Sequence, residues 1–130
     1  MAVRVAILAS PLEPDHRLGA AGGACGAVVE FQGIVRGIEN GEPISAIDYE
    51  CHVPMAEAQL DRIAGDVATS FGLAEMVVLH RIGIVPVGEA SLYVRAEAAH
   101  RHEALAAVGE FIESLKRDVP IWKRPVARGG

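Results

Sequence analysis

Hydrophobic residues recur at helical spacing in two stretches of the chain. In the first, apolar side chains follow one another at intervals of three or four residues: Ala56, Leu60, Ile63, Val67 and Phe71. Pro54 precedes this run, where the first turn of a helix accepts proline, and Gly72 follows it as a terminator. The second stretch, residues 100–118, stops before Pro120, and its expected apolar face contains Leu105, Val108, Phe111, Ile112 and Leu115. The pattern predicts helices over residues 54–71 and 100–118.

The other hydrophobic stretches are shorter, rich in valine and isoleucine, and typical of β-strands. They cover residues 3–9, 25–36, 44–53, 76–80, 89–98 and 121–126. Within 89–98 an apolar set alternates with a polar one, and this period of two predicts a strand that is buried on one face only. The apolar set is Leu92, Val94 and Ala96, and the polar set is Ser91, Tyr93, Arg95 and Glu97.

Residues 37–43 resemble a turn and contain the pair Asn40-Gly41. Asn-Gly is a preferred pair in tight hairpin turns, so the sequence predicts that residues 25–36 and 44–53 form a hairpin. Gly33, inside the first of these strands, indicates a bulge or a close approach of another backbone. Residues 11–24 and 81–88 are expected to be loops.

This order of strands and helices predicts an α+β fold, a mostly antiparallel sheet with two long helices packed on it. At 130 residues, with no linker or internal repeat, residues 1–130 are expected to form a single domain. Half of the residues are hydrophobic but only 5% are aromatic, so the core must consist mainly of Ala, Val, Leu and Ile.

Composition excludes several classes of protein. The net charge of −5 argues against binding to duplex DNA or to a membrane surface. The apolar run after Arg4 is too short for a signal peptide, and no stretch approaches the length of a membrane span. Cys25 and Cys51 lack the spacing of metal ligands. We therefore expect free thiols, a cytoplasmic location and no metal or other cofactor.

Basic residues are concentrated near the end of the chain. Residues 114–130 contain five lysines and arginines and one acid, on a protein that is acidic overall. A local positive charge of this kind indicates a small anionic ligand, whereas nucleic acid needs a broad basic face. Pro120 would fix the backbone within the cluster, and Trp122 would supply a rigid apolar anchor. The alternative is a solvated helix end whose basic residues complement the helix dipole.

Both lysines of the chain, Lys116 and Lys123, lie in this cluster, and all other basic residues outside histidine are arginines. A lysine can act as an acid, a base or a nucleophile when it is desolvated or close to other cations, whereas an arginine cannot. The chain has no phosphate-binding glycine loop and no Gly-x-Ser-x-Gly nucleophile motif. The lysines are therefore the best candidates for catalysis.

Two further places in the sequence are candidates for anion binding: the pair His100-Arg101, and Arg36. His100 and Arg101 lie where a strand passes into a helix, and helix N-termini attract anions. Arg36 closes a strand and can clamp a phosphate. The alternatives are that Arg101 is a residue of the first helical turn with no role in binding and that Arg36 is a solvated loop residue.

His80 and Arg81 end another predicted strand. They indicate either a second cationic site or a structural pair in which Arg81 contacts an acid. Glu50 is a candidate for that acid, and the sequence leaves open whether it is instead a general base.

An ordered set of short motifs resembles the catalytic (large) subunit family of molybdopterin synthase over about residues 24–124. The motifs are Gly26-Ala-Val-Val, Phe31-x-Gly-x-Val-Arg36, Tyr49-Glu50, Met55-Ala56, His80-Arg-Ile-Gly83, Gly88-Glu89, Ala99-His-Arg101, Leu115-Lys116 and Pro120-Ile-Trp-Lys123.

The resemblance implies an α/β-hammerhead type of fold and a sulfurtransferase of molybdenum cofactor biosynthesis. The family converts cyclic pyranopterin monophosphate (precursor Z) into molybdopterin by installing the two sulfur atoms of the dithiolene. Sulfur arrives as a C-terminal thiocarboxylate on a small ubiquitin-like partner that ends in Gly-Gly. The large subunit forms a homodimer with one small subunit at each distal end, a heterotetramer.

By the same resemblance, Lys116 meets the partner's C-terminus and Lys123 is a second catalytic lysine that contacts the substrate. His100 and Arg101 match positions that bind the pterin phosphate. Arg36 matches an arginine that reaches the pocket from the neighbouring protomer.

The chain departs from the family pattern after residue 124, where the family continues with a tail of further tryptophan and basic residues. The alternative function is a non-catalytic module that keeps the fold and the anion pocket. The terminal Gly129-Gly130 matches the ending of a sulfur carrier, but the motifs above belong to the other subunit.

Overall fold

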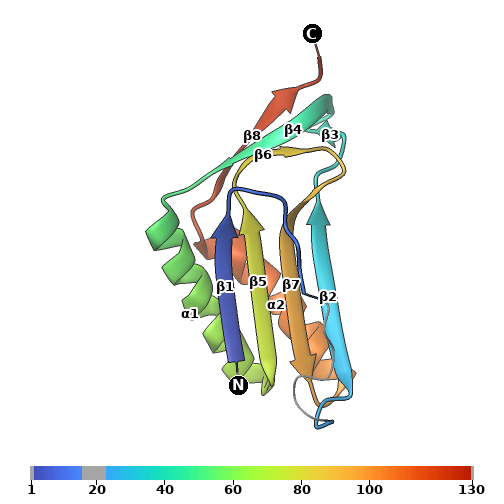
Figure 1. Cartoon of the computed structure of the whole chain (residues 1–130), viewed down its shortest axis with the longest axis vertical. Coiled ribbons are helices and arrows are strands. Elements are labelled where there is room, and N and C mark those ends of the chain that lie inside the picture. Colours follow the sequence, from blue (N-terminus) through green and yellow to red (C-terminus); the bar gives the residue numbers. More distant parts are fainter. Residues whose placement is uncertain (1, 16–22, 130) are drawn as a thin grey trace.

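The computed structural model describes residues 2–15 and 23–129, which form two β-sheets and two helices (Figure 1). The elements in chain order are β1 (Ala2–Leu8), β2 (Ala27–Ile34), β3 (Ile38–Glu39), β4 (Glu42–Glu50), α1 (Val53–Phe71), β5 (Glu75–Arg81), β6 (Gly83–Pro86), β7 (Ala90–Ala98), α2 (Arg101–Asp118) and β8 (Trp122–Ala127). The predicted α+β fold is confirmed. Residues 16–22 of the expected 11–24 loop lie outside the described residues.

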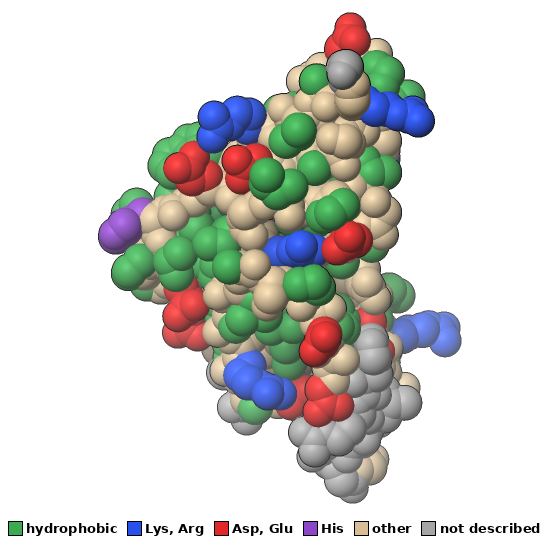
Figure 2. Space-filling model, turned by 45° about the horizontal axis from the view of Figure 1, so that its top comes forward, with side chains coloured by type: hydrophobic (Ala, Val, Ile, Leu, Met, Phe, Trp, Pro, Cys, Tyr) green, Lys and Arg blue, Asp and Glu red, His purple; other side chains and the backbone are tan. Residues whose placement is uncertain are grey.

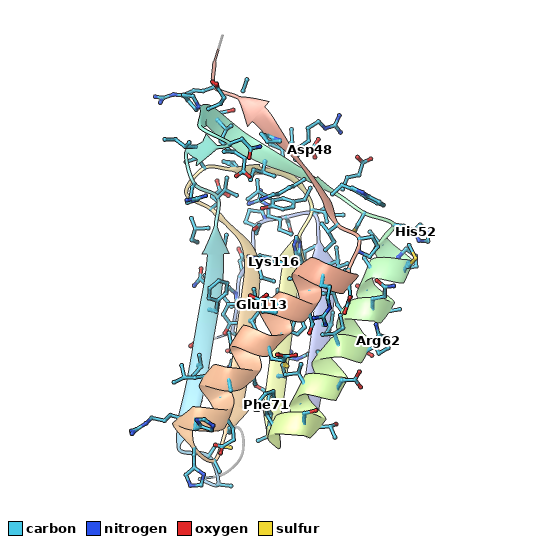
Figure 3. The ribbon with its side chains drawn as sticks, turned by 180° about the vertical axis from the view of Figure 1, so that it is seen from behind. Asp48, His52, Arg62, Phe71, Glu113 and Lys116 are labelled. Carbon is cyan, nitrogen blue, oxygen red and sulfur yellow. The ribbon has the colours of Figure 1, made fainter. Side chains whose placement is uncertain are left out.

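The main sheet has four strands in the order β1-β5-β7-β2. β1 and β5 are parallel, whereas β7 is antiparallel to both β5 and β2, so the sheet is mixed but mostly antiparallel. Both helices pack against one face of this sheet and against each other (Figures 1 and 3). This layered arrangement buries the apolar face of each helix.

The two helices follow the predicted boundaries closely. α1 carries Pro54 in its first turn and ends at Gly72, whose φ of 62° is the left-handed conformation that suits glycine. α2 ends at Asp118, and the next residue, Val119, is extended because Pro120 follows it. Leu105 corrects the predicted apolar face: it lies on α2 but is 58% exposed.

The main core lies between the helices and the sheet. Its fully buried members include Leu60 from α1, Phe111 from α2, and Met76, Val78 and Val94 from the sheet. Small residues let the helices approach the strands, since Ala56, Ala64, Ala96, Ala104 and Ala107 are also fully buried.

The prediction that β7 is buried on one face only is wrong, because its polar side is buried too. The Tyr93 hydroxyl donates a hydrogen bond to Glu30 at 2.7 Å, and the Arg95 guanidinium donates to the Asp15 carbonyl at 3.0 Å. Arg95 also lies 3.4 Å from Glu97, which has no exposed surface. Burial together with the neighbouring Glu30 raises the pKa of Tyr93 above its ordinary value of 10. Tyr93 and Arg95 therefore make polar contacts within the protein instead of facing water.

The second sheet crosses one end of the first (Figure 1). β4 is its central strand and pairs with β3, β6 and β8, in each case antiparallel. A small separate core supports it and contains Val35, Ile44, Ile47 and Val85. The segment from residue 81 to residue 88, which the sequence indicated as a loop, includes β6.

The predicted hairpin of residues 25–36 with 44–53 is also wrong. β2 pairs with β7 in the main sheet, while β4 belongs to the second sheet. The Asn40-Gly41 turn exists, but it joins β4 to the short strand β3. Both turn residues have positive φ angles, 52° and 79°, as a two-residue hairpin loop of the favoured hand requires.

We predict that Gly26→Ala lowers the free energy of unfolding. A Cβ atom at Gly26 would lie 2.8 Å from the backbone oxygen of Ala99, so the strand end must shift. We expect a loss of roughly 1–3 kcal/mol in denaturant unfolding.

Gly109→Ala is the matched control for this prediction. Gly109 is exposed within α2, and an added Cβ would meet no atom within 4 Å. Alanine there should raise stability by about 0.5–1 kcal/mol. Equal effects of the two substitutions would contradict the assigned contact at Gly26.

Candidate active site

A pocket of about 530 Å³ lies where the C-terminal end of α2 meets the main sheet and the second sheet. Its volume is within the range of small-molecule sites. Segments from five strands and one helix line it: Phe31, Gly33, Ile34, Tyr49, His80, Ser91, Leu92, Ile112, Leu115, Lys116, Val119, Ile121 and Lys123. Both lysines singled out by the sequence are among these residues.

Lys116 reaches the pocket from the last turn of α2, on the end of the helix nearest the second sheet (Figure 3). It lies one turn after Ile112, which also lines the pocket, so the two side chains share a helix face. Within residues 2–15 and 23–129, Lys116 has no ion-pair partner. Its ammonium is therefore available to an anion.

Lys123 reaches the same pocket from β8. Its ammonium lies 3.2 Å from the carboxylate of Glu39 on β3, and its backbone is opposite Tyr49 on β4. Pro120 turns the chain out of α2, and β8 then pairs with β4, which brings Lys123 back across the helix end. The side chains of Trp122 and Arg124 do not line the pocket, because successive side chains of a strand point to opposite faces.

Tyr49 and His80 form a second feature of the pocket. Their rings meet edge to face, with centroids 5.4 Å apart and planes at 77°. His80 is 6% exposed, and its Nδ1 lies 2.9 Å from the Arg81 carbonyl oxygen. Burial lowers the pKa of the His80 imidazole below its ordinary value of 6.5, and the hydrogen bond to the Arg81 carbonyl opposes this shift only in part.

Acidic residues compensate most of the basic cluster. Arg117 pairs with Asp118 at 3.1 Å. Arg124 lies 3.5 Å from Glu50 and 3.9 Å from Asp48. On the face seen in Figure 2, basic side chains lie singly and not in one patch. The expected apolar anchor, Trp122, is 62% exposed. Arg128 is exposed and does not line the pocket, so the positive charge of the pocket comes from Lys116 and Lys123.

The other predicted site residues lie elsewhere in the chain. His100 caps α2 and Arg101 begins it, so both are at the opposite end of the helix from Lys116. Arg101 and Lys116 are fifteen positions apart in the sequence, so their backbones are about 22 Å apart along the helix axis. Arg36 is exposed in the bend between β2 and β3 and does not line the pocket.

Arg81 has the structural role that the sequence offered as one alternative, but with a different acid. Its guanidinium donates to Glu89 at 2.7 Å, not to Glu50. His80, its neighbour, faces the pocket instead. The sequence analysis treated the two as one unit and missed the contact of His80 with Tyr49; the only signal was the position of His80 at the end of a predicted strand.

The described residues contain no cluster of three or more histidine, cysteine or acidic side chains that would hold a metal ion. Cys25 and Cys51 are free thiols, as expected, and burial raises the pKa of Cys51, which disfavours its reactive thiolate. None of the described helices has the length and apolar character needed to cross a membrane.

The family model described as MoaE protein matches residues 7–118. Proteins named molybdopterin synthase catalytic subunit are similar to the chain. One from Rattus norvegicus is 40% identical over 102 residues, which cover 78% of this chain and 51% of that protein. One from Thermoplasma volcanium is 35% identical over 105 residues, which cover 81% of this chain and 77% of that protein. The chain thus spans about half the length of the mammalian relatives it matches.

Solved structures agree with this match. A molybdopterin synthase structure from Staphylococcus aureus has a TM-score of 0.82 at 27% identity and covers 95% of this chain and 91% of its own. A complex of subunits 1 and 2 of molybdopterin-converting factor from Helicobacter pylori has a chain with a TM-score of 0.77. Its identity is 23%, with 97% of this chain and 86% of that chain covered, so it supports the fold alone.

Burial of His80 predicts a loss of stability at mildly acidic pH. Since its folded-state pKa lies below 6.5, the unfolded chain takes up the proton first as the pH falls. The free energy of unfolding therefore decreases below about pH 6.5 until the folded-state pKa is passed. His80→Asn should remove this contribution, because an asparagine amide can still donate to the Arg81 carbonyl but does not titrate.

The measurement is denaturant unfolding of both proteins between about pH 5 and pH 8. The difference between their free energies of unfolding should change with pH, with the wild type losing more on the acidic side. Parallel curves over the whole range would contradict a role for His80.

Proposed function

Because this chain belongs to the MoaE protein family, we propose that it is the catalytic subunit of a molybdopterin synthase. It transfers sulfur from the C-terminal thiocarboxylate of a small ubiquitin-like partner to cyclic pyranopterin monophosphate and so forms the dithiolene of molybdopterin. The observation that carries the proposal is that both lysines of the chain line one pocket. The free thiols fit a reducing compartment, and we place the reaction in the cytoplasm.

The chemistry requires cations, because the cyclic phosphate, the thiocarboxylate and the departing carboxylate are all anions. Lys116 has no carboxylate partner among the described residues, so it is free to polarise the carbonyl of the carrier's terminus or to move a proton there. Lys123 is held by Glu39 at 3.2 Å, which fixes its position against the substrate. The two lysines thus have different tasks.

The entrance of the pocket suits a narrow extended tail. Phe31 and Ile34, both on β2, line the pocket and are 37% and 47% exposed, so they offer apolar contacts at its rim. A Gly-Gly terminus has no side chains to obstruct it, and its carboxyl end would enter toward Lys116. This is our reason for placing the sulfur carrier on this side of the protein.

Arg36, His100 and Arg101 contribute to the site from a second copy of the chain. In one copy, Arg101 is about 22 Å from Lys116 along α2, farther than one pterin monophosphate reaches. All three residues are exposed, so they are available to a neighbouring protomer. A homodimer would bring cations for the phosphate to the pocket, and with two carriers it would form a heterotetramer.

A non-catalytic binding module is the second candidate. It would hold the carrier and an anion in the same pocket but would yield no product. The intact pair of lysines favours the enzyme, and the assay below separates the two.

We predict that Lys116→Ala lowers molybdopterin formation by at least about 100-fold, since it removes a charge that stabilises the transition state. The measurement mixes the protein with thiocarboxylated carrier and precursor Z and quantifies the product. The free energy of unfolding should change little, because Lys116 is exposed and has no ion-pair partner among the described residues.

Arg117→Ala is the matched control, because Arg117 lies on the same helical turn but lines the groove between α1 and α2. It should retain nearly full activity. Carrier binding without product in the wild type would favour the binding module, and neither product nor complex would leave only the fold in common with the family.

A mixing experiment tests the shared site. Arg101→Ala alone should raise KM for precursor Z, and Lys116→Ala alone should be inactive. In a mixed dimer of the two variants, one of the two sites keeps both residues. At precursor Z concentrations far below the raised KM, random exchange of subunits in an equal mixture should therefore restore about a quarter of wild-type activity. No recovery after verified exchange would show that Lys116 and Arg101 do not act in one site across two copies.

A further inference from the structure

Among the residues that the structure describes, His80 is the one histidine that lines the pocket, and its ring makes two contacts. It lies on β5 and is in edge-to-face contact with Tyr49 on β4, at a centroid distance of 5.4 Å. Its Nδ1 is 2.9 Å from the carbonyl oxygen of Arg81. These contacts fix the plane of the ring, as a group that handles protons requires.

The hydrogen bond also fixes the tautomer. A carbonyl oxygen can only accept, so Nδ1 carries the hydrogen and donates it. In the neutral ring, Nε2 is then a lone-pair acceptor. It has no hydrogen-bond partner among the described residues, and the ring keeps 6% of its surface exposed within the wall of the pocket.

Burial disfavours the imidazolium form and lowers the pKa of His80, so this imidazole is neutral at neutral pH. Three titratable side chains share the pocket with it: Tyr49 from β4, Lys116 from α2 and Lys123 from β8. Arg81, next along β5, is paired with Glu89 at 2.7 Å and brings no unpaired charge to the ring. Among these groups His80 is the one that accepts a proton at neutral pH.

We propose that His80 Nε2 is the proton acceptor for the water that releases the sulfur carrier. This inference rests on the proposed function. When the thiocarboxylate sulfur has bonded to the pterin, it still holds the acyl carbon of the carrier. Water must then attack that carbon, and an attacking water becomes a better nucleophile as it loses a proton to a nearby base.

The water oxygen bonds to the acyl carbon, the acyl–sulfur bond breaks, and its electron pair stays on sulfur as the pterin thiolate. One water proton goes to His80 Nε2, and the second leaves the new carboxylic acid for solvent. The carrier departs as a carboxylate, and the imidazolium returns its proton to solvent. No oxidant or reductant is needed.

His80→Asn tests this role, because its amide can replace the Nδ1 donor to Arg81 but leaves no base at the Nε2 position. With carrier and precursor Z, we expect turnover to fall by about 100-fold or more. KM should change little, and a covalent carrier–pterin thioester should accumulate, detectable by mass spectrometry. The acidic limb of the kcat–pH profile, present in the wild type, should be absent.

His52→Asn is the matched control: His52 is exposed at the start of α1, outside the pocket, and its replacement should leave the profile unchanged. Full activity of His80→Asn, or an unchanged acidic limb, would overturn the proposal.

His80→Gln separates a base from a structural residue, since its amide oxygen can accept a hydrogen bond near the Nε2 position but cannot take a proton. Recovery of activity in His80→Gln would overturn the proposal, and continued inactivity with the same thioester would support it, even if His80→Asn does not fold. Wild-type protein that binds the carrier but forms neither thioester nor product would instead refute the proposed function itself.

Discussion

The antiparallel pairing of β8 with β4 is the contact on which the pocket depends. β4 pairs along its other side with β6, which follows β5 after a single residue. Tyr49 on β4 therefore lies between Gly83 of β6 and Lys123 of β8. Its ring makes the edge-to-face contact with His80. Without this strand pairing, the chain beyond Pro120 would be a free tail, and Lys123 would have no fixed relation to Lys116.

Charge in the pocket is set by pairing more than by the number of basic residues. The last part of the chain is strongly basic, but Arg117 and Arg124 are compensated by acids, and Lys123 shares its charge with Glu39. Lys116 remains without such a partner among the residues described. Because no carboxylate among these residues pairs with its ammonium, Lys116 can bind an incoming anion without first breaking an ion pair. The two lysines look equivalent in the sequence but differ in the structure, because Lys123 has a carboxylate partner and Lys116 has none among the described residues.

Local features of the sequence predicted the helices almost to the residue, because periodicity, Pro54, Gly72 and Pro120 act within a turn of the chain. Strand pairing was harder, since it joins segments far apart: β2 pairs with β7 and not with its neighbour β4. The prediction that β7 is buried on one face only failed for the same reason, because the contacts of Arg95 with Asp15 and Glu75 come from other parts of the chain. The lysines could be chosen from chemistry alone, whereas Tyr49 and His80 meet only after two sheets are assembled.

The alternation of side chains in β8 has a consequence for how this chain can change in length. Lys123 faces the pocket, whereas its neighbours Trp122 and Arg124 do not line it. An insertion or deletion of one residue between α2 and β8 that shifts the register of β8 on β4 by one would exchange the lysine for an indole or a guanidinium. A change of two residues would restore the face but move the group along the strand by one side-chain repeat. The connection of four residues between the last helix and Lys123 is therefore expected to tolerate changes in length less well than the other loops of this protein.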